Sequence, residues 1–300
     1  MPEKVVTGVY AAIGTPRDLA GRVDARALRF ALQFLMQKGI RGFALNGATG
    51  EYCIASPGDL STIVEAGAEA TKGRAEFVCG IGAAGIGGTV ENGRIAIEGG
   101  AKGLLLPMPH FFPYEQDDLD AFCRAAAEQL PAPILLYNLP VFTTGLEAPT
   151  VLRLVADCPN IVGIKDSSGS LEILRALTES GMDACRIVGS DNALAGALRE
   201  RVSDGVISGV AYVLPELLLA LYAQGKTPET AEFGELSRRL DEFIGATGGF
   251  PVPWALKWIA ESRSIAPASF SQPLSRRRRE QGRKLQEWFS NWHAAAEVTG

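Results

Sequence analysis

The chain has 300 residues, of which 47% are hydrophobic and 21% are charged, and its formal net charge is −5. These values describe a globular protein with a large core, and the acidic balance argues against nucleic acid or an anionic membrane as a partner. The only histidines are His110 and His293, which nearly excludes a multi-histidine metal site and disfavours a Ser-His-Asp hydrolase.

The sequence shows no sign of membrane insertion or secretion. No apolar run reaches the roughly 18 residues of a membrane-spanning helix, and the first residues lack the apolar stretch of a signal peptide. The cysteines are scattered without a Cys-x-x-Cys pair, which is typical of small core residues in a reducing compartment. We therefore expect a cytoplasmic protein with no membrane partner.

Short apolar runs alternate along the chain with amphipathic windows of helical period. The runs predict strands at Val9–Ile13, Gly42–Leu45, Glu76–Gly80, Gly103–Leu106, Pro133–Tyr137, Ile161–Ile164, Arg186–Val188 and Gly205–Ile207. The windows predict helices at Asp24–Gln37, Pro57–Thr71, Gly88–Glu98, Tyr114–Gln129, Pro149–Ala156, Leu171–Glu179, Ala193–Glu200 and Pro215–Ala223. Strand starts recur at roughly the 30 residues of one βαβ repeat, so the pattern favours a (β/α)8 TIM barrel over an open doubly wound sheet.

The pattern changes after Gly225, where no further strand is predicted. Helices are expected at Thr230–Ile244, Val252–Glu261 and Ser275–Ala295. We therefore assign residues 1–225 to a catalytic barrel and residues 226–300 to a C-terminal three-helix extension. The arginine run 276–279 is expected to be a solvated or interface face, and the tryptophans spaced at i, i+4 in this extension favour core or subunit packing over ligand binding.

In a barrel of this kind, functional side chains gather at the carboxyl ends of the strands. The predicted strands end in the segments NGATGE (46–51), PMPHFFP (107–113), YNLP (137–140), KDSSG (165–169), GSDN (189–192) and SG (208–209). Lys165 ends a buried strand, and the turn of residues 166–169 is expected to cap a helix that starts near Leu171. This lysine is either a structural, ion-paired side chain or a desolvated amine whose lowered pKa lets it attack a carbonyl.

Two other segments favour the chemical role of Lys165. Tyr137 lies 28 residues upstream, which is one repeat, so both side chains should lie at the same end of adjacent strands. A phenol beside an amine can move protons during carbinolamine formation, although a tyrosine can also simply cap a core. The NGATGE loop offers backbone amides and the Thr49 hydroxyl to a carboxylate, although a plain glycine turn is the alternative.

One glycine-rich motif could instead indicate a dinucleotide-binding site. Gly80, Gly82 and Gly85 form a Gly-x-Gly-x-x-Gly pattern between a predicted strand and a predicted helix, as in dinucleotide-binding folds. Such folds also place an acidic residue at the end of the next strand, but here that strand leads into Pro107. We therefore expect no nicotinamide cofactor.

The motifs GATGE, YNLP and GIKDSSG occur in this order on an eight-repeat pattern with a helical tail. Together they resemble the dihydrodipicolinate synthase/N-acetylneuraminate lyase family over essentially the whole chain. The resemblance implies a homotetramer (a dimer of dimers) without metal or organic cofactor, which forms a Schiff base with pyruvate or another 2-oxo acid. It implies these roles by position: nucleophile for Lys165, catalytic tyrosine for Tyr137, carboxylate binding for Ala48 and Thr49, and pyruvate lining for Ile207.

Three positions depart from the pattern of dihydrodipicolinate synthases. Their Thr-Thr pair is Ala48-Thr49 here, and the tyrosine that they donate across a subunit interface is Phe111, preceded by His110. Their arginine that binds the second substrate's carboxylate falls at Phe142. Since a phenylalanine can neither relay a proton nor pair with a carboxylate, we expect a less anionic acceptor site. Candidate groups for binding substrate hydroxyls are Ser190, Asp191 and Ser208.

These observations lead to three hypotheses. The first is a Schiff-base lyase that cleaves, condenses or dehydrates a 2-oxo acid, such as a 2-keto-3-deoxy sugar acid, with an aldehyde as the partner substrate. The second is a 4-hydroxy-tetrahydrodipicolinate synthase that condenses pyruvate with aspartate semialdehyde through different acceptor residues. The third is a non-catalytic barrel that binds a 2-oxo acid, which the presence of both Lys165 and Tyr137 disfavours.

Overall fold

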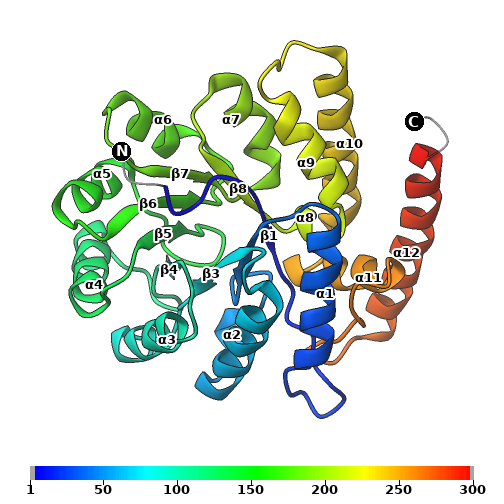
Figure 1. Cartoon of the computed structure of the whole chain (residues 1–300), viewed down its shortest axis with the longest axis horizontal. Helices are drawn as coiled ribbons and strands as arrows, with labels where there is room; N and C mark the ends of the chain where they lie inside the picture. Colours follow the sequence, from blue (N-terminus) through cyan, green and yellow to red (C-terminus); the bar gives the residue numbers. More distant parts are fainter. Residues whose placement is uncertain (1–3, 298–300) are drawn as a thin grey trace.

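The computed structural model describes residues 4–297 and contains a closed barrel of parallel strands in the order β1 to β8, with β1 paired to β8 (Figure 1). The strands are β1 (Gly8–Ala12), β2 (Gly42–Leu45), β3 (Glu76–Gly80), β4 (Gly103–Pro107), β5 (Ile134–Asn138), β6 (Ile161–Asp166), β7 (Cys185–Val188) and β8 (Gly205–Ser208). This architecture confirms the predicted TIM barrel.

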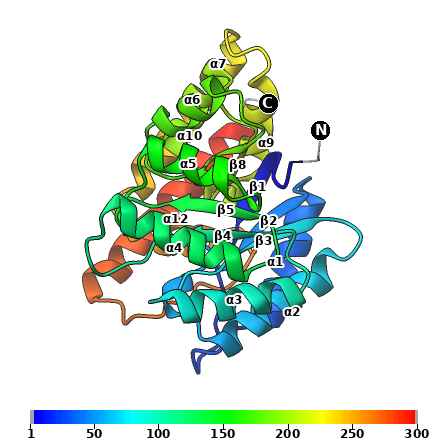
Figure 2. The same cartoon turned by 90° about the vertical axis from the view of Figure 1, so that its left-hand side faces the viewer.

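A ring of helices surrounds the strands, as the side view in Figure 2 shows for α3, α4 and α5. The α-helices are α1 (Ala25–Gln37), α2 (Pro57–Thr71), α3 (Ile86–Glu98), α4 (Gln116–Gln129), α5 (Ala148–Asp157), α6 (Glu172–Glu179), α7 (Leu194–Glu200), α8 (Val210–Val213), α9 (Pro215–Gln224), α10 (Ala231–Thr247), α11 (Val252–Ser262) and α12 (Arg276–Glu297). Two short 3₁₀ helices, η1 (Tyr52–Ile54) and η2 (Asp191–Ala193), were not predicted, and neither was α8. Each is a single turn, too short to show a helical period in the sequence.

The strands separate two hydrophobic layers, because successive side chains of a strand point to opposite faces. One layer fills the barrel interior and includes Tyr10, Val78, Leu105, Leu135 and Ile187. The other layer lies between the strands and the surrounding helices. This division directs alternate residues at the strand ends either into the barrel mouth or toward the helices.

Most predicted element bounds agree with the structure within two residues, and the difference at β6 matters most. β6 extends through Lys165 and Asp166 because these residues pair with Tyr137 and Asn138 of β5. The predicted bound at Ile164 was therefore two residues short, whereas the expectation that Lys165 lies at the end of the strand agrees with the structure within one residue. The expected helix cap was wrong: Asp166 accepts a hydrogen bond from the Ser168 amide, and α6 begins at Glu172.

The C-terminal helices α10, α11 and α12 lie on one side of the ring, where α10 contacts α9 and α11 contacts α8 and α12 (Figure 1). Their tryptophans pack as predicted: the rings of Trp288 and Trp292 stack 5.5 Å apart, and Trp258 is buried. The arginine run opens α12, and Arg276, Arg277 and Arg279 are exposed there. Among residues 4–297, no helix has the length and apolar character needed to cross a bilayer.

Two glycines of the Gly-x-Gly-x-x-Gly pattern, Gly80 and Gly82, serve close packing. A Cβ atom on Gly80 would lie 2.0 Å from the backbone oxygen of Asn46, and one on Gly82 would lie 2.4 Å from the ring of Tyr52. Both distances are far below a normal van der Waals contact. Gly80 and Gly82 thus allow the close approach of the β2 loop to β3.

Candidate active site

Lys165 and Tyr137 form the centre of the candidate site. The parallel register of β5 and β6 places the two residues directly opposite each other. The Nζ atom of Lys165 donates a hydrogen bond of 2.7 Å to the hydroxyl oxygen of Tyr137, and both side chains are buried. The amine and the phenol predicted from one repeat of spacing are therefore in direct contact.

Burial sets the proton affinities of this pair. Loss of solvation lowers the pKa of Lys165 to about 7, and the nearby carboxyl of Asp191 opposes this shift. Desolvation raises the pKa of Asp191 to about 6 and raises the pKa of the Tyr137 hydroxyl above its ordinary value. At neutral pH a large share of Lys165 is therefore an uncharged, nucleophilic amine, while Tyr137 holds its proton.

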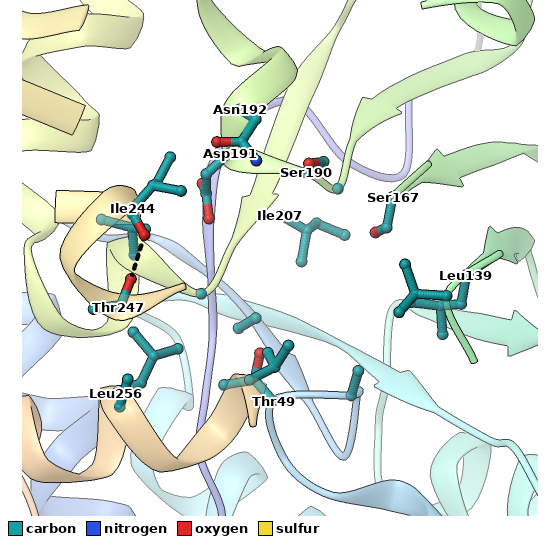
Figure 3. Close-up of a pocket in the computed structure, with 18 of the residues that line it drawn as sticks. Thr49, Leu139, Ser167, Ser190, Asp191, Asn192, Ile207, Ile244, Thr247 and Leu256 are labelled. Atoms are coloured by element: carbon teal, nitrogen blue, oxygen red, sulfur yellow. Dashed lines mark hydrogen bonds between the residues drawn. The ribbon is translucent and has the colours of Figure 1, made fainter. Parts of the chain in front are cut away.

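A cavity of about 310 Å³ opens above the pair at the carboxyl ends of the strands (Figure 3). Its polar wall comes from Thr49, Ser167, Ser190, Asp191 and Asn192, and Figure 3 shows the Ser167 hydroxyl and the Asp191 carboxyl at the cavity. Its apolar wall consists of Leu139, Val141, Phe142, Ile207, Val210, Ile244, Phe250, Val252, Ala255 and Leu256. The volume suits a small organic acid, and most of the polar groups come from the segments that follow β2, β6 and β7.

The Asn46–Glu51 loop forms the floor of this cavity beside the pair. Two of its residues, Asn46 and Glu51, adopt left-handed backbone conformations, with φ of 50° and 59°. The Asn46 side-chain amide donates to the Gly80 carbonyl at 2.8 Å, and the Thr15 hydroxyl donates to the Gly50 carbonyl at 2.9 Å. These bonds hold the loop so that Ala48 and Thr49 line the cavity. Preordered amides and a hydroxyl at this place can bind a carboxylate.

Gly189, at the end of β7, lets the lysine reach this position. A Cβ atom there would lie 2.1 Å from the Ser167 hydroxyl and 2.9 Å from the Cε atom of Lys165. The lysine side chain therefore lies against bare backbone. Only glycine allows such close contact without displacing the amine.

The structure brings most of the predicted site residues to the cavity. The lining includes Lys165, Tyr137, Ala48, Thr49, Ile207, Phe142 and Ser190. Three candidates lie elsewhere. Ser208 is fully buried, where its hydroxyl donates to Asp191 and accepts a bond from the Ala211 amide. His110 lines a neighbouring groove, and the Phe111 side chain is 88% exposed.

Sequence reasoning missed two parts of the site. Ser167 was interpreted as part of a helix cap, but it lines the cavity two residues beyond Lys165. The α10–α11 segment was placed in an extension behind the barrel, yet Ile244, Phe250, Val252 and Leu256 close one side of the cavity. The signal for Ser167 was its position after a strand-end lysine, whereas no local pattern marks the α10–α11 wall.

The part of the chain that the structure describes contains no group of three His, Cys, Asp or Glu side chains arranged to hold a metal ion. The reactive groups that line the cavity are an amine, a phenol, hydroxyls and one carboxyl. This set suits covalent chemistry on a carbonyl followed by proton transfer.

Known proteins resemble this chain in sequence and in fold. The model of the dihydrodipicolinate synthetase family matches residues 5–291. A 4-hydroxy-tetrahydrodipicolinate synthase from Sorangium cellulosum is 34% identical over 217 residues, which cover 72% of each chain. A protein of the same name from Listeria monocytogenes is 26% identical over 285 residues and covers 94% of this chain and 96% of its own.

Two solved structures have the same fold. Dihydrodipicolinate synthase from Aquifex aeolicus superimposes with a TM-score of 0.88 at 23% identity, covering 96% of this chain and 98% of its own. A sialic acid aldolase from Ruminococcus gnavus superimposes with a TM-score of 0.87 at 18% identity, covering 97% and 99%. The match to the family model over residues 5–291 confirms the predicted resemblance, and the chain belongs to the dihydrodipicolinate synthetase family of class I lyases.

Proposed function

We propose that the chain forms a Schiff base between Lys165 and pyruvate or a related 2-oxo acid. The observation that carries this proposal is the 2.7 Å contact between the Lys165 amine and the Tyr137 hydroxyl inside a buried cavity. The pKa of Lys165, lowered to about 7 by burial, supplies the neutral amine that must attack the C2 carbonyl. The carboxylate of the 2-oxo acid then lies on the Ala48 and Thr49 amides and the Thr49 hydroxyl.

Tyr137 would transfer the protons in the steps of this reaction. Attack by the amine gives a carbinolamine, and the phenol donates a proton to its hydroxyl, which leaves as water and yields the protonated imine beside the Tyr137 phenolate. Because burial raises the pKa of Tyr137, the phenolate left behind is a strong base, able to remove a proton from C3 and form the enamine. The enamine attacks the aldehyde carbon while the re-formed Tyr137 phenol donates its proton to the aldehyde oxygen, and water then hydrolyses the protonated imine and releases the product from Lys165; cleavage is the reverse.

The second half-reaction depends on the acceptor. Ser190, Asp191 and Asn192 offer hydrogen bonds to hydroxyls, which supports a 2-keto-3-deoxy sugar acid as the substrate class. Phe142 is apolar and 54% exposed at the cavity rim, where an anionic acceptor would need a cation. Cleavage, condensation or dehydration of such a substrate would all use the same enamine.

A 4-hydroxy-tetrahydrodipicolinate synthase is the second candidate, because the curated relatives from Sorangium cellulosum and Listeria monocytogenes carry that name. The roles of Lys165 and Tyr137 would be unchanged, and aspartate semialdehyde would be the aldehyde. Its carboxylate would have to bind without an arginine at position 142. Family membership and the reactive pair both argue against a non-catalytic barrel.

The oligomeric state, the division of the chain into domains and its location are also proposed. Enzymes of this family act on small-molecule substrates and are usually oligomeric. A homotetramer, built as a dimer of dimers, would cover the exposed Phe111 and Phe112 side chains. We also propose residues 1–225 as the catalytic barrel, residues 226–300 as its helical extension, and the cytoplasm as the location.

One experiment tests the mechanism. The protein is incubated with pyruvate, reduced with borohydride and digested, and the adduct is mapped by mass spectrometry. A reduced pyruvate adduct on Lys165 is expected, and an unmodified Lys165 would overturn the Schiff base. A panel of keto-sugar acids and aldehydes then separates the two substrate classes, since efficient turnover of aspartate semialdehyde would favour the synthase.

A further inference from the structure

A buried ion pair joins the Asn46–Glu51 loop to the C-terminal helices. The Glu51 carboxylate accepts a hydrogen bond from the Lys257 ammonium of α11, and both side chains are buried. The Ser271 hydroxyl donates to the other oxygen of Glu51 at 2.7 Å. The partners lie 206 and 220 positions beyond Glu51 in the chain. The loop is thus held by parts of the fold far from it in sequence.

The contacts of Glu51 also fix the part of the loop that lines the cavity. Glu51 lies two residues after Thr49 and has a left-handed backbone, which a glutamate adopts only when its surroundings fix it. The Gly50 carbonyl between them is bound by the Thr15 hydroxyl. Because only Gly50 separates Glu51 from Thr49, we expect a displacement of Glu51 to change the position of the Thr49 hydroxyl and the amides beside it.

Helix α11, which carries Lys257, also lines the cavity beside Thr49. A Cβ atom on Gly209 would lie 3.0 Å from the Leu256 side chain and 3.4 Å from the Thr49 hydroxyl, so both side chains meet the backbone at the end of β8. Lys257, the residue after Leu256 in α11, forms the ion pair with Glu51. One turn of α11 therefore contacts the Asn46–Glu51 loop and the cavity wall together.

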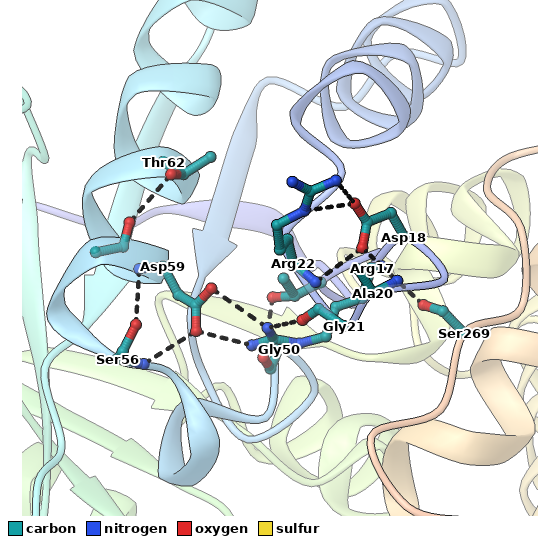
Figure 4. A network of polar contacts seen from close by, with 12 residues as sticks. Arg17, Asp18, Ala20, Gly21, Arg22, Gly50, Ser56, Asp59, Thr62 and Ser269 are labelled. Carbon is teal, nitrogen blue, oxygen red and sulfur yellow. Dashed lines mark hydrogen bonds and ion pairs between the residues drawn. The ribbon is translucent and has the colours of Figure 1, made fainter.

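A second attachment runs parallel to the first (Figure 4). The Arg17 amide donates to the Ser269 hydroxyl at 2.9 Å, two residues before Ser271 in the same segment. The Arg17 guanidinium contacts Asp59, and Asp59 closes the capping box of α2. The segment that contains Ser269 and Ser271 thus links the loops after β1 and β2.

A buried ion pair is better suited to fixing a geometry than to adding stability. Burial lowers the pKa of Lys257, and the Glu51 carboxylate opposes that shift. Removing one partner leaves an unpaired charge buried in the interior. Replacing both partners by neutral groups removes the cost of taking the two charges out of water. Thermal stability and loop position can therefore be separated by mutation.

We propose that Glu51 and Lys257 are positioning residues, through which α11 sets the place of the carboxylate-binding groups of Thr49 and Ala48. The inference rests on the proposed function, because it takes the Asn46–Glu51 loop as the seat of the 2-oxo acid carboxylate. It gives the C-terminal helices a part in substrate binding in addition to closing the cavity.

Three variants test this role: Lys257→Met, Glu51→Gln and the double variant. Hydrogen–deuterium exchange of residues 46–52, the KM and kcat for the 2-oxo acid, and the Tm are measured on each. Lys284→Met is the matched control, because it removes an exposed lysine that pairs with Glu280 on α12. The control should leave all four quantities unchanged.

The single variants should lower Tm, accelerate exchange of residues 46–52 and raise KM on the order of tenfold with kcat nearly unchanged, because Lys165 and Tyr137 are intact. In the double variant Tm should recover, while the fast exchange and the high KM persist. Joint recovery of Tm, exchange and KM would reduce the pair to a structural role and overturn the proposal, as would unchanged exchange in the single variants. Wild-type protein that gives no borohydride adduct would instead refute the Schiff base, and the exchange data would still report on the loop.

Discussion

The Nζ atom of Lys165 lies 2.7 Å from the hydroxyl oxygen of Tyr137, although 28 residues separate them in the chain. The parallel pairing of β5 with β6 creates this contact, because residues one repeat apart occupy the same level of adjacent strands. Both residues are buried, and the Asp191 carboxyl is the charged group that acts on Lys165. The contact therefore joins a reactive amine to its proton carrier within the barrel mouth.

Replacing Lys165 by methionine should abolish activity and leave the fold intact. The change removes the nucleophile, so kcat should fall at least about a thousandfold, and borohydride should trap no pyruvate. Methionine fills a similar volume and needs no solvation, so Tm should stay equal or rise. Thermal unfolding and adduct mapping check both points; a trapped adduct on another lysine would contradict the assignment.

The lowered pKa of Lys165 predicts two pH dependences. Adduct formation should rise with pH through about 7 and then level, as the amine loses its proton. An ordinary lysine would show this rise only above pH 10. Because the unfolded state keeps the proton over a range where the folded state has lost it, stability should increase with pH above 7, by up to about 1.4 kcal/mol per pH unit. Urea unfolding between pH 7.5 and 9.5 should show this increase in the free energy of unfolding for the wild type. The increase should be absent in Lys165→Met.

Tyr137→Phe should separate imine formation from proton transfer. The ring still fills its place in the barrel, but the hydroxyl that accepts from Lys165 is gone. General acid–base catalysis commonly contributes about 10² to 10⁴ in rate, so kcat should fall within that range. Rapid-quench trapping should still detect the adduct, formed slowly. An unchanged kcat would remove Tyr137 from the mechanism.

The repeat pattern made the barrel and the Lys165–Tyr137 pair predictable, because strand spacing alone sets which strand ends are neighbours. It could not place Leu256 or Val252 at the cavity, since the path of α11 depends on packing against α8 and α12. Ser208 shows a second limit. It was predicted to follow the last strand but is the final residue of β8, and bonds to Asp191 and the Ala211 amide hold its hydroxyl away from substrate. Side-chain direction is a tertiary property that no strand pattern encodes.

Gly189→Ala should impair catalysis through Lys165. The added methyl group would overlap the Ser167 hydroxyl and press on the lysine side chain. A misplaced nucleophile can cost on the order of a hundredfold, so kcat/KM should fall by about that factor. The double variant Ser167→Ala/Gly189→Ala removes the closer clash and should recover part of the loss. Equal activity of Gly189→Ala and wild type would show that the lysine has room to move.

Phe142→Arg should move the substrate preference toward an anionic aldehyde. Phe142 lies at the cavity rim, and a guanidinium there would offer two parallel hydrogen bonds to a carboxylate. The kcat/KM for aspartate semialdehyde should therefore rise about tenfold or more, while trapping of pyruvate on Lys165 stays unchanged. Val141→Arg is the control, because that neighbouring side chain also lies at the rim but is 78% exposed. An equal gain in both variants would indicate general electrostatic attraction. A wild-type enzyme that already turns over aspartate semialdehyde efficiently, with no gain from Phe142→Arg, would mean that other groups bind the acceptor carboxylate.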